Sequence, residues 1–127
     1  MKKRILLVDD DSTYIFVIKM LLQKHGTVGE IVTAANGFEA LEILRGGFDT
    51  GVLPQVIISD IEMPVMNGIT FFKELEKLKL VDYAVTRIIL NSNDHQYDTM
   101  DWSVEIPTVV YFPKPLLDEQ LLSILAD

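Results

Sequence analysis

The sequence predicts a single α/β domain in which helices cover both faces of a doubly wound, five-stranded parallel sheet. Strand-like and helix-like segments alternate five times along its 127 residues, which is typical of parallel sheets with right-handed crossovers. The segment Gln55–Ser59 contains an unbroken apolar run, as expected for a central strand that is buried on both faces. A chain of this length can bury a full hydrophobic core without disulfides, and it contains no cysteine.

Each element follows from the spacing of its apolar residues and from the residues that flank it. In chain order, the predicted strands and helices cover Arg4–Val8, Ser12–Lys24, Ile31–Ala34, Phe38–Arg45, Gln55–Ser59, Ile69–Lys79, Arg87–Leu90, Thr108–Phe112 and a last helix to Leu125. The first helix has an apolar stripe that includes Tyr14, and Gly26 is its stop. Asn36 and Gly46-Gly47 flank the second helix as its start and end signals. Asp118 is the predicted N-cap of the last helix.

The third and fourth helices differ in the clarity of their patterns. The third is predicted to face the core with Phe72, Leu75 and Leu78, which recur every three residues. A fourth helix should lie between Asn93 and Pro107, but that stretch has few good helix formers and no clean apolar stripe. We therefore expect the fourth helix to be short or irregular.

Charge and hydropathy exclude several classes of protein. The net charge is −8 at pH 7 and no basic run is longer than Lys2-Lys3-Arg4, so the electrostatic signature of a nucleic-acid-binding protein is missing. No window approaches the roughly 20 apolar residues that a membrane span needs. The apolar stretch behind the basic N-terminus ends at Asp9, too early for a signal peptide. The sequence therefore favours a cytoplasmic protein that binds neither membranes nor nucleic acids.

Charged side chains follow three of the predicted strands, at the point where each strand ends. Asp9, Asp10 and Asp11 follow the first strand, Asp60 follows the third, and Lys114 comes two residues after the fifth. The carboxyl ends of parallel strands meet at one edge of the sheet, where open α/β folds bind ligands. Carboxylates crowded there repel one another unless a cation neutralises them. The pattern predicts a phosphoryl-handling site with a divalent ion and a lysine, in which Asp11 is better explained as a helix cap or first-turn charge than as a ligand.

Three motifs, taken together, resemble the receiver domain of two-component response regulators in order and spacing. They are Leu7-Val8-Asp9-Asp10-Asp11, then Ile58-Ser59-Asp60-Ile61-Glu62-Met63-Pro64 running on to Gly68, then Lys114-Pro115. The strand–helix alternation extends the resemblance to essentially the whole chain. It implies a flavodoxin-like sheet with strand order 2-1-3-4-5, a receiver domain over residues 1–127, and no output domain.

The resemblance also implies a role for each matching residue. Asp60 is the expected phosphoacceptor, whose carboxylate would become an acyl phosphate. Asp9 and Asp10, with Asp60 and the backbone carbonyl of Glu62, would bind Mg²⁺, which prefers oxygen ligands. Lys114 would pair with a phosphoryl oxygen. Structural roles are implied for Pro64, Gly68 and Pro115, the last of which would follow a cis bond that aims the lysine into the site.

One position departs from the family pattern. Thr or Ser usually ends the fourth strand, whereas this chain has Leu90-Asn91-Ser92, which places Asn91 there. An amide can still donate to a phosphoryl oxygen, but it is larger than a hydroxyl and cannot rotate in the same way. Ser92 would supply the hydroxyl if the strand end shifts by one residue. Tyr111 matches the aromatic switch position, and its coupling to the site is expected to be weakened or rerouted.

The resemblance implies a signalling protein rather than an enzyme. A histidine kinase or phosphotransfer protein would donate the phosphoryl group, and the domain, as a monomer or weak homodimer, would then contact an unidentified downstream protein. Its expected activities are self-phosphorylation from small phosphodonors and slow self-dephosphorylation. Two alternatives are a pseudo-receiver with a weakened switch, which Asn91 favours, and a Mg²⁺-dependent phosphohydrolase with an aspartyl nucleophile. Phosphohydrolases of this kind have an Asp-x-Asp pattern directly after a strand, whereas here Asp60 is followed by Ile61 and Glu62.

Overall fold

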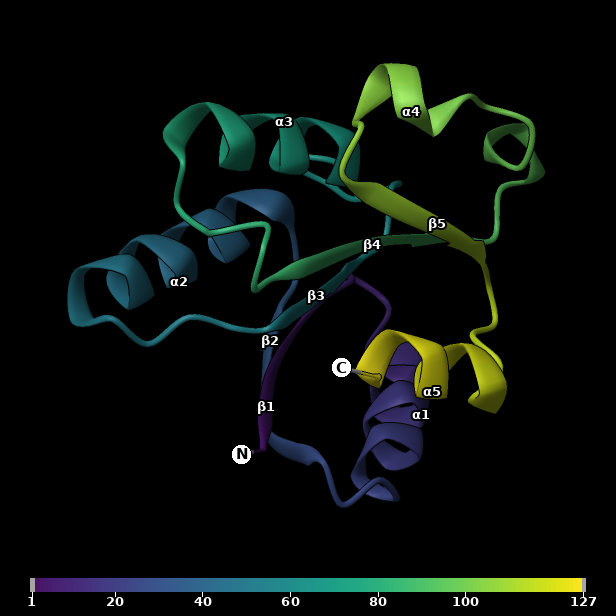
Figure 1. Cartoon of the computed structure of the whole chain (residues 1–127). Helices are drawn as coiled ribbons and strands as arrows, with labels where there is room; N and C mark the ends of the chain where they lie inside the picture. The colour runs from purple at the N-terminus through teal and green to yellow at the C-terminus, as the bar shows by residue number, and fades with distance from the viewer. Residues whose placement is uncertain (1, 127) are drawn as a thin grey trace.

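The computed structural model describes residues 2–126 and contains the predicted parallel sheet (Figure 1). The strands are β1 (Lys3–Val8), β2 (Val28–Ala34), β3 (Val56–Ser59), β4 (Arg87–Ser92) and β5 (Val109–Pro113), in the order β2-β1-β3-β4-β5 with all pairs parallel. The helices are α1 (Ser12–Gln23), α2 (Gly37–Thr50), α3 (Gly68–Leu78), α4 (Trp102–Glu105) and α5 (Asp118–Leu125), with a short 3-10 helix, η1, over His95–Tyr97. The predicted fold class and strand order are confirmed.

The side chains of the strands alternate between two hydrophobic clusters, one on each face of the sheet. Leu6 and Leu90 belong to the cluster under α2 and α3, whereas Ile5, Leu7 and Ile89 belong to the cluster under α1 and α5. Figure 1 shows α1 and α5 together on one face and α2 and α3 on the other. All four residues of β3 are buried, as the apolar run predicted. Because successive side chains of a strand point to opposite faces, the position of a residue at a strand end determines the face of the sheet on which its side chain lies.

The predicted end of the second helix is wrong. Helix α2 runs through Gly46 and Gly47 to Thr50, and it ends at Gly51, whose φ of 76° is the left-handed conformation favoured at a helix C-terminus. A Cβ atom at Gly47 would lie 2.4 Å from the carbonyl oxygen of Val52. Glycine at this position therefore allows the following loop to pack closely against the helix. The local sequence pattern does not reveal this contact.

Other departures from the predicted elements are smaller. Leu78 is exposed, and α3 buries Phe71 beside Phe72 instead. Asp118 is the first residue of α5 and not its N-cap; Leu117 precedes the helix, and its N–H donates to the Gln120 side chain at 2.9 Å.

Strand positions account for the remaining differences. Strand β2 begins at Val28 rather than Ile31, since an edge strand tolerates the exposed Glu30. Strand β5 lies at the other edge of the sheet, and none of its residues is buried. Pro113 ends β5, where its missing N–H is tolerated.

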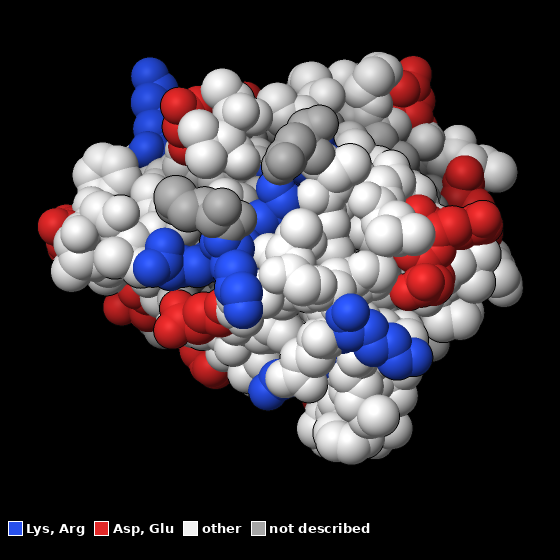
Figure 2. Space-filling model, turned by 60° about the horizontal axis from the view of Figure 1, so that its bottom comes forward, with Lys and Arg blue, Asp and Glu red and all other residues white. Residues whose placement is uncertain are grey.

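The segment between β4 and β5 is irregular, as predicted, because it forms only η1 and the four-residue α4. Over residues 2–126, no helix is long and apolar enough to cross a membrane. On the face turned forward in Figure 2, lysine and arginine side chains form one small group and otherwise stand singly among acidic and uncharged residues. The charge on that face is thus mixed rather than uniformly basic.

Candidate functional site

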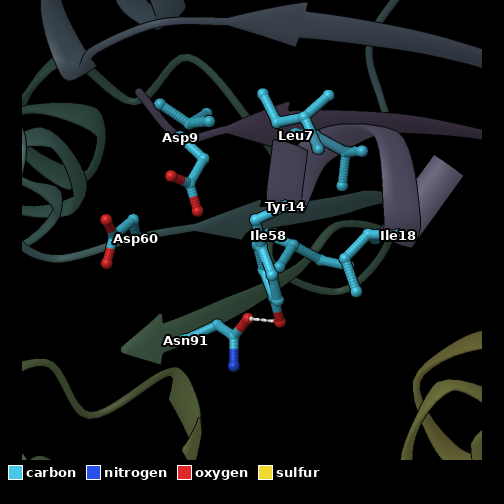
Figure 3. Close-up of a pocket in the computed structure, with 9 residues that line it drawn as sticks. Leu7, Asp9, Tyr14, Ile18, Ile58, Asp60 and Asn91 are labelled. Atoms are coloured by element: carbon cyan, nitrogen blue, oxygen red, sulfur yellow. Dashed lines mark hydrogen bonds between the residues drawn. The ribbon is translucent and has the colours of Figure 1, made fainter. Parts of the chain in front are cut away.

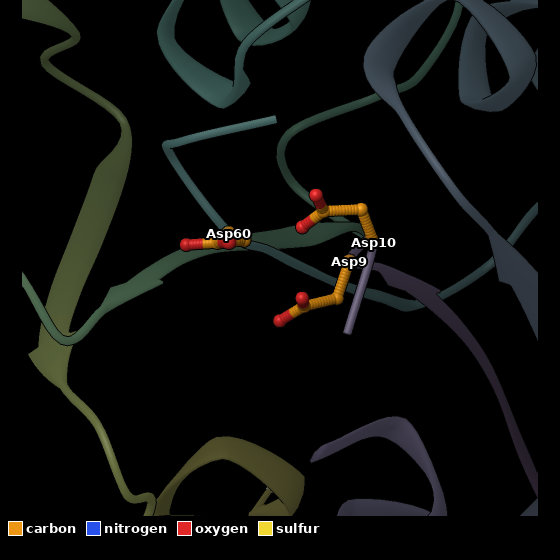
Figure 4. Close-up of side chains that lie close together, drawn as sticks. All are labelled: Asp9, Asp10 and Asp60. Carbon is orange, nitrogen blue, oxygen red and sulfur yellow. The ribbon is translucent and has the colours of Figure 1, made fainter. Parts of the chain in front are cut away.

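The carboxylates predicted to meet at the carboxyl edge of the sheet do lie together. Asp9 and Asp10 follow β1, Asp60 follows the neighbouring β3, and oxygen atoms of the three side chains all lie within 4.8 Å of one another (Figure 4). The Asp60 N–H donates to the carbonyl of Val8 at 2.8 Å, which extends the β1–β3 pairing to the site. Asp9 and Asp60 are buried and Asp10 is exposed, so the group opens to solvent on the Asp10 side.

Lys114 reaches the same group from the end of β5. Its backbone N–H donates to the carbonyl of Ser92 at 2.8 Å, and its Nζ lies 2.8 Å from Oδ2 of Asp9 and 3.6 Å from Oδ2 of Asp60. The lysine side chain is only 9% exposed. The predicted cis bond between Lys114 and Pro115 is present. A buried ammonium group thus offsets part of the repulsion between the carboxylates.

Asp60 has an environment that perturbs its ionisation. Burial, followed by the negative charge of Asp9, raises the pKa of Asp60 from 3.8 to about 6, while Lys114 and the N–H of Ile61, which donates to Oδ1 at 2.7 Å, act in the opposite direction. Perturbed carboxylates of this kind gather at functional sites. In the metal-free site the charged form of Asp60 is therefore less favoured than that of an ordinary aspartate, and an added cation would favour it.

The loop after Asp60 is held by close backbone packing. A Cβ atom at Gly68 would lie 2.0 Å from the carbonyl oxygen of Asp60, and the Gly68 N–H donates to the carbonyl of Ile61 at 2.9 Å. The carbonyl of Pro64 accepts from the N–H of Met66 at 2.7 Å within the same loop. The structural roles of Pro64 and Gly68 stay predictions.

Asp11 and Glu62 flank the carboxylate group. Asp11 is the N-cap of α1, where its Oδ1 accepts from the N–H groups of Thr13 and Tyr14, and it is thus engaged as a cap. The Glu62 side chain accepts a hydrogen bond from the Tyr97 hydroxyl. A role for the Glu62 carbonyl as a metal ligand stays a prediction.

Asn91 lies beside the acidic group, and both ends of its amide are engaged. It continues the row of Ile89 on the α1 face of β4 and lines a small cavity with Asp9 and Asp60 (Figure 3). Its Nδ2 donates to the carbonyl of Phe112 at 2.9 Å. Its Oδ1 accepts from the Tyr14 hydroxyl at 2.5 Å. The amide is therefore fixed by β5 and α1.

Ser92 occupies the following position of β4, and the period of two turns its side chain to the opposite face from Asn91. Its hydroxyl accepts from the N–H of Asp94 at 3.1 Å and so supports the turn that leads to η1. The strand therefore brings Asn91, and not Ser92, to the cavity beside Asp60.

Tyr14 is a site residue that the sequence reasoning missed. Its apolar spacing placed it on the buried stripe of α1, but the ring lies 4.3 Å from the Nζ of Lys114, and the hydroxyl also accepts from the N–H of Leu116 at 3.2 Å. Burial raises the pKa of Tyr14 to about 12, so the hydroxyl stays protonated and can donate to Asn91. The sequence signal that could have identified Tyr14 is its hydroxyl group in the first turn of the helix, directly after the acidic motif.

Tyr111 belongs to an aromatic cluster next to the site. Its ring stacks on Trp102 at 5.5 Å between centroids, and its hydroxyl donates to Oδ1 of Asp98 at 2.7 Å. Tyr97 packs on the same indole at 6.2 Å and donates its hydroxyl to Glu62, two residues after Asp60. The cluster therefore has two connections toward the site, one through β5 and one through Glu62.

The donor set fits a magnesium ion. Mg²⁺ is bound in proteins by one or two carboxylates, with water or phosphate oxygens completing the shell. Asp9, Asp10 and Asp60 offer oxygens within 4.8 Å of one another, and Asp10 is open to solvent. The same group contains no cysteine or histidine, which would favour softer transition metals.

Comparison with known proteins agrees with this geometry. The family described as the response regulator receiver domain matches residues 5–126. The protein PilH of Pseudomonas aeruginosa is 31% identical and aligns over 94% of this chain and 91% of its own length. Protein-glutamate methylesterase/protein-glutamine glutaminase 2 of Vibrio vulnificus is 29% identical over 90% of this chain, which spans only 31% of that protein.

A solved structure supports the fold independently. The two-component response regulator from Cytophaga hutchinsonii has a TM-score of 0.87, covers 98% of this chain with 95% of its own, and is 24% identical. The parallel sheet, the acidic group at its carboxyl edge and the match over residues 5–126 lead to one conclusion. The chain belongs to the response regulator receiver domain family of two-component signalling.

Proposed function

We propose that this domain accepts a phosphoryl group on Asp60 from a histidine kinase or phosphotransfer protein and then signals to a downstream protein by direct contact. The observation that supports this most strongly is the placement of one ammonium group, Lys114 Nζ, within 3.6 Å of the Asp60 carboxylate and 2.8 Å of Asp9. In this proposal the domain spans residues 1–127 and acts in the cytoplasm as a signalling module rather than as an enzyme.

The transfer step follows from the positions of these groups. A carboxylate oxygen of Asp60 forms a bond to the phosphorus atom of a phosphohistidine, while the P–N bond breaks and its electron pair stays on the imidazole nitrogen. Lys114, whose Nζ lies 3.6 Å from Oδ2 of Asp60, would pair with a phosphoryl oxygen as charge shifts in the transition state. Mg²⁺, when bound by Asp9, Asp10 and Asp60, would supply further charge neutralisation.

Phosphorylation is expected to depend on Asp60 alone. Incubation with acetyl phosphate and Mg²⁺ should add the mass of one phosphoryl group to the wild-type protein, and Asp60→Asn should lose this gain completely because an amide is not a nucleophile here. Asp49→Asn, an exposed change on α2, is the matched control and should react like the wild type. A mass gain that persists in Asp60→Asn contradicts the assignment, and steady turnover of phosphate esters would support the phosphohydrolase alternative.

The switch is expected to respond weakly through Asn91. Because both ends of the Asn91 amide are hydrogen-bonded, it cannot follow a phosphoryl group as a free hydroxyl would. Beryllofluoride with Mg²⁺, a phosphoryl mimic, should therefore shift the Tyr111 NMR signals only slightly, and Asn91→Thr should enlarge that shift. The fluorescence of Trp102 should also change when beryllofluoride binds, because Tyr97 connects Trp102 to Glu62. Tyr97→Phe should make this fluorescence change smaller.

Two results would count against this account of the switch. One is a full inward shift of Tyr111 in the wild type that Asn91→Thr does not increase. The other is a Trp102 response that is unchanged in Tyr97→Phe, because that would remove Glu62 as a connection between the site and the aromatic cluster.

A further inference from the structure

Tyr14 contacts three residues of the site from helix α1. Figure 3 shows one of these contacts, the hydrogen bond between Tyr14 and Asn91. The Tyr14 ring faces the ammonium of Lys114 at 4.3 Å, and the Tyr14 hydroxyl donates to Asn91 at 2.5 Å and accepts from the Leu116 N–H at 3.2 Å. These contacts join α1 to the end of β4 and to the loop that follows β5. One side chain thus bridges residues that are 77 and 102 positions away in the sequence.

We propose that Tyr14 is a positioning residue for phosphoryl transfer, in which the ring holds the Lys114 ammonium beside Asp60 and the hydroxyl holds Asn91 in one orientation. This inference rests on the proposed function of Asp60 as phosphoacceptor. It assigns the two halves of the tyrosine side chain to two separable tasks.

The ring acts on the lysine together with the carboxylates of Asp9 and Asp60. A lysine side chain is a point charge on a flexible stem, so its hydrogen bonds alone define its position poorly. Asp9 and Asp60 attract Nζ from one side, and the negative face of the Tyr14 ring attracts it from another. With the ring removed, the ammonium is free to move toward solvent or wholly onto Asp9, away from the phosphoryl position.

The hydroxyl acts on Asn91. The Phe112 carbonyl holds the nitrogen of the amide, and the Tyr14 hydroxyl is the donor to its oxygen. Loss of that donor would leave a buried acceptor without this partner, and the amide would then turn to find another. Asn91 would then be able to move toward the phosphoryl group, which its two hydrogen bonds prevent in the wild type.

Three variants separate these tasks. Tyr14→Phe keeps the ring and removes the hydroxyl, Tyr14→Leu removes both, and Phe16→Leu is the matched control because Phe16 is exposed on the same helix. Each is compared with the wild type in the rate of phosphorylation by acetyl phosphate, in Mg²⁺ affinity by calorimetry, and in the NMR shift that the ring current produces on the ε-methylene protons of Lys114.

Tyr14→Leu should lose the ring-current shift and be phosphorylated about tenfold more slowly, since a small misplacement of a charge-stabilising group is costly. It should still bind Mg²⁺, because the three carboxylates are unchanged, with an affinity altered only by the new position of the Lys114 ammonium. Tyr14→Phe should keep the ring-current shift and be slowed less than Tyr14→Leu, while the side-chain amide signals of Asn91 move and beryllofluoride shifts Tyr111 more. Phe16→Leu should change none of these values.

Several outcomes overturn the proposal. If the wild type is phosphorylated and Tyr14→Leu reacts equally fast, the ring has no positioning role, whether or not the fold is less stable. If Tyr14→Leu loses phosphorylation and Mg²⁺ affinity together, the effect is a general collapse of the site. If the NMR signals of the Asn91 side-chain amide are unchanged in Tyr14→Phe, the Tyr14 hydroxyl does not fix the orientation of Asn91. Failure of the wild type itself to be phosphorylated would instead refute the proposed function and this inference with it.

Discussion

Replacing Lys114 by methionine is expected to destabilise the metal-free domain by about 3–5 kcal/mol, the cost of removing one partner from a buried ion pair. Lys114 lies between Asp9 and Asp60, which are 6% and 7% exposed, and the variant would leave both carboxylates without their cation. Urea denaturation in the presence of a chelator measures this loss. Lys73→Met is the matched control, because the ion pair of Lys73 with Glu105 is exposed and should be worth no more than about 1 kcal/mol.

Magnesium should recover part of the stability lost in Lys114→Met, because an ion bound to the native state would neutralise the same carboxylates. The gain in melting temperature on adding Mg²⁺ should thus be larger in Lys114→Met than in the wild type. Asp10→Asn should have the opposite effect: the metal-free protein becomes more stable as repulsion falls, and its Mg²⁺ response is lost. A Lys114→Met loss no larger than that of Lys73→Met, or an unchanged Mg²⁺ response in Asp9→Asn/Asp10→Asn, would contradict this description of the site.

The fold and the position of the acidic group could be predicted because both depend on short-range patterns. An apolar run such as that of β3 has few alternatives to a buried strand, and parallel strands bring their carboxyl ends to one edge wherever they lie in the sequence. Asp9, Asp10, Asp60 and Lys114 therefore lie together as expected. Their chemical roles rest on the family and remain predictions until phosphorylation is measured.

Features that depend on contacts between distant segments could not be predicted in this way. Gly47 lies inside α2, where the carbonyl of Val52 leaves no room for a Cβ atom, although a glycine pair often marks the end of a helix. Tyr14 has the spacing of a core residue, and only the folded chain shows that its hydroxyl reaches Asn91. The stack of Tyr111 on Trp102 likewise joins an edge strand to an irregular segment that has no periodic signal of its own.

The second large effect is expected in the pH dependence of stability. Burial and the charge of Asp9 raise the pKa of Asp60 from 3.8 to about 6 in the metal-free fold. Between these two values the unfolded chain gives up a proton that the native state keeps, so the native state binds more protons and the contribution of this group to stability falls as pH rises. Above about pH 6 the loss is complete, and below about pH 4 it is absent.

Asp60→Asn removes this titration, so the variant should be more stable than the wild type near neutral pH in the presence of a chelator. Allowing for solvent screening, the difference should be on the order of 1–2 kcal/mol. It should shrink as pH falls through the range between 6 and 4, whereas Asp49→Asn should track the wild type throughout. Urea unfolding at several pH values gives these differences, and carboxyl NMR gives the Asp60 pKa directly. A constant difference between Asp60→Asn and the wild type across this range would contradict the raised pKa. It would mean that Lys114 and the Ile61 N–H already offset both the burial of Asp60 and the charge of Asp9.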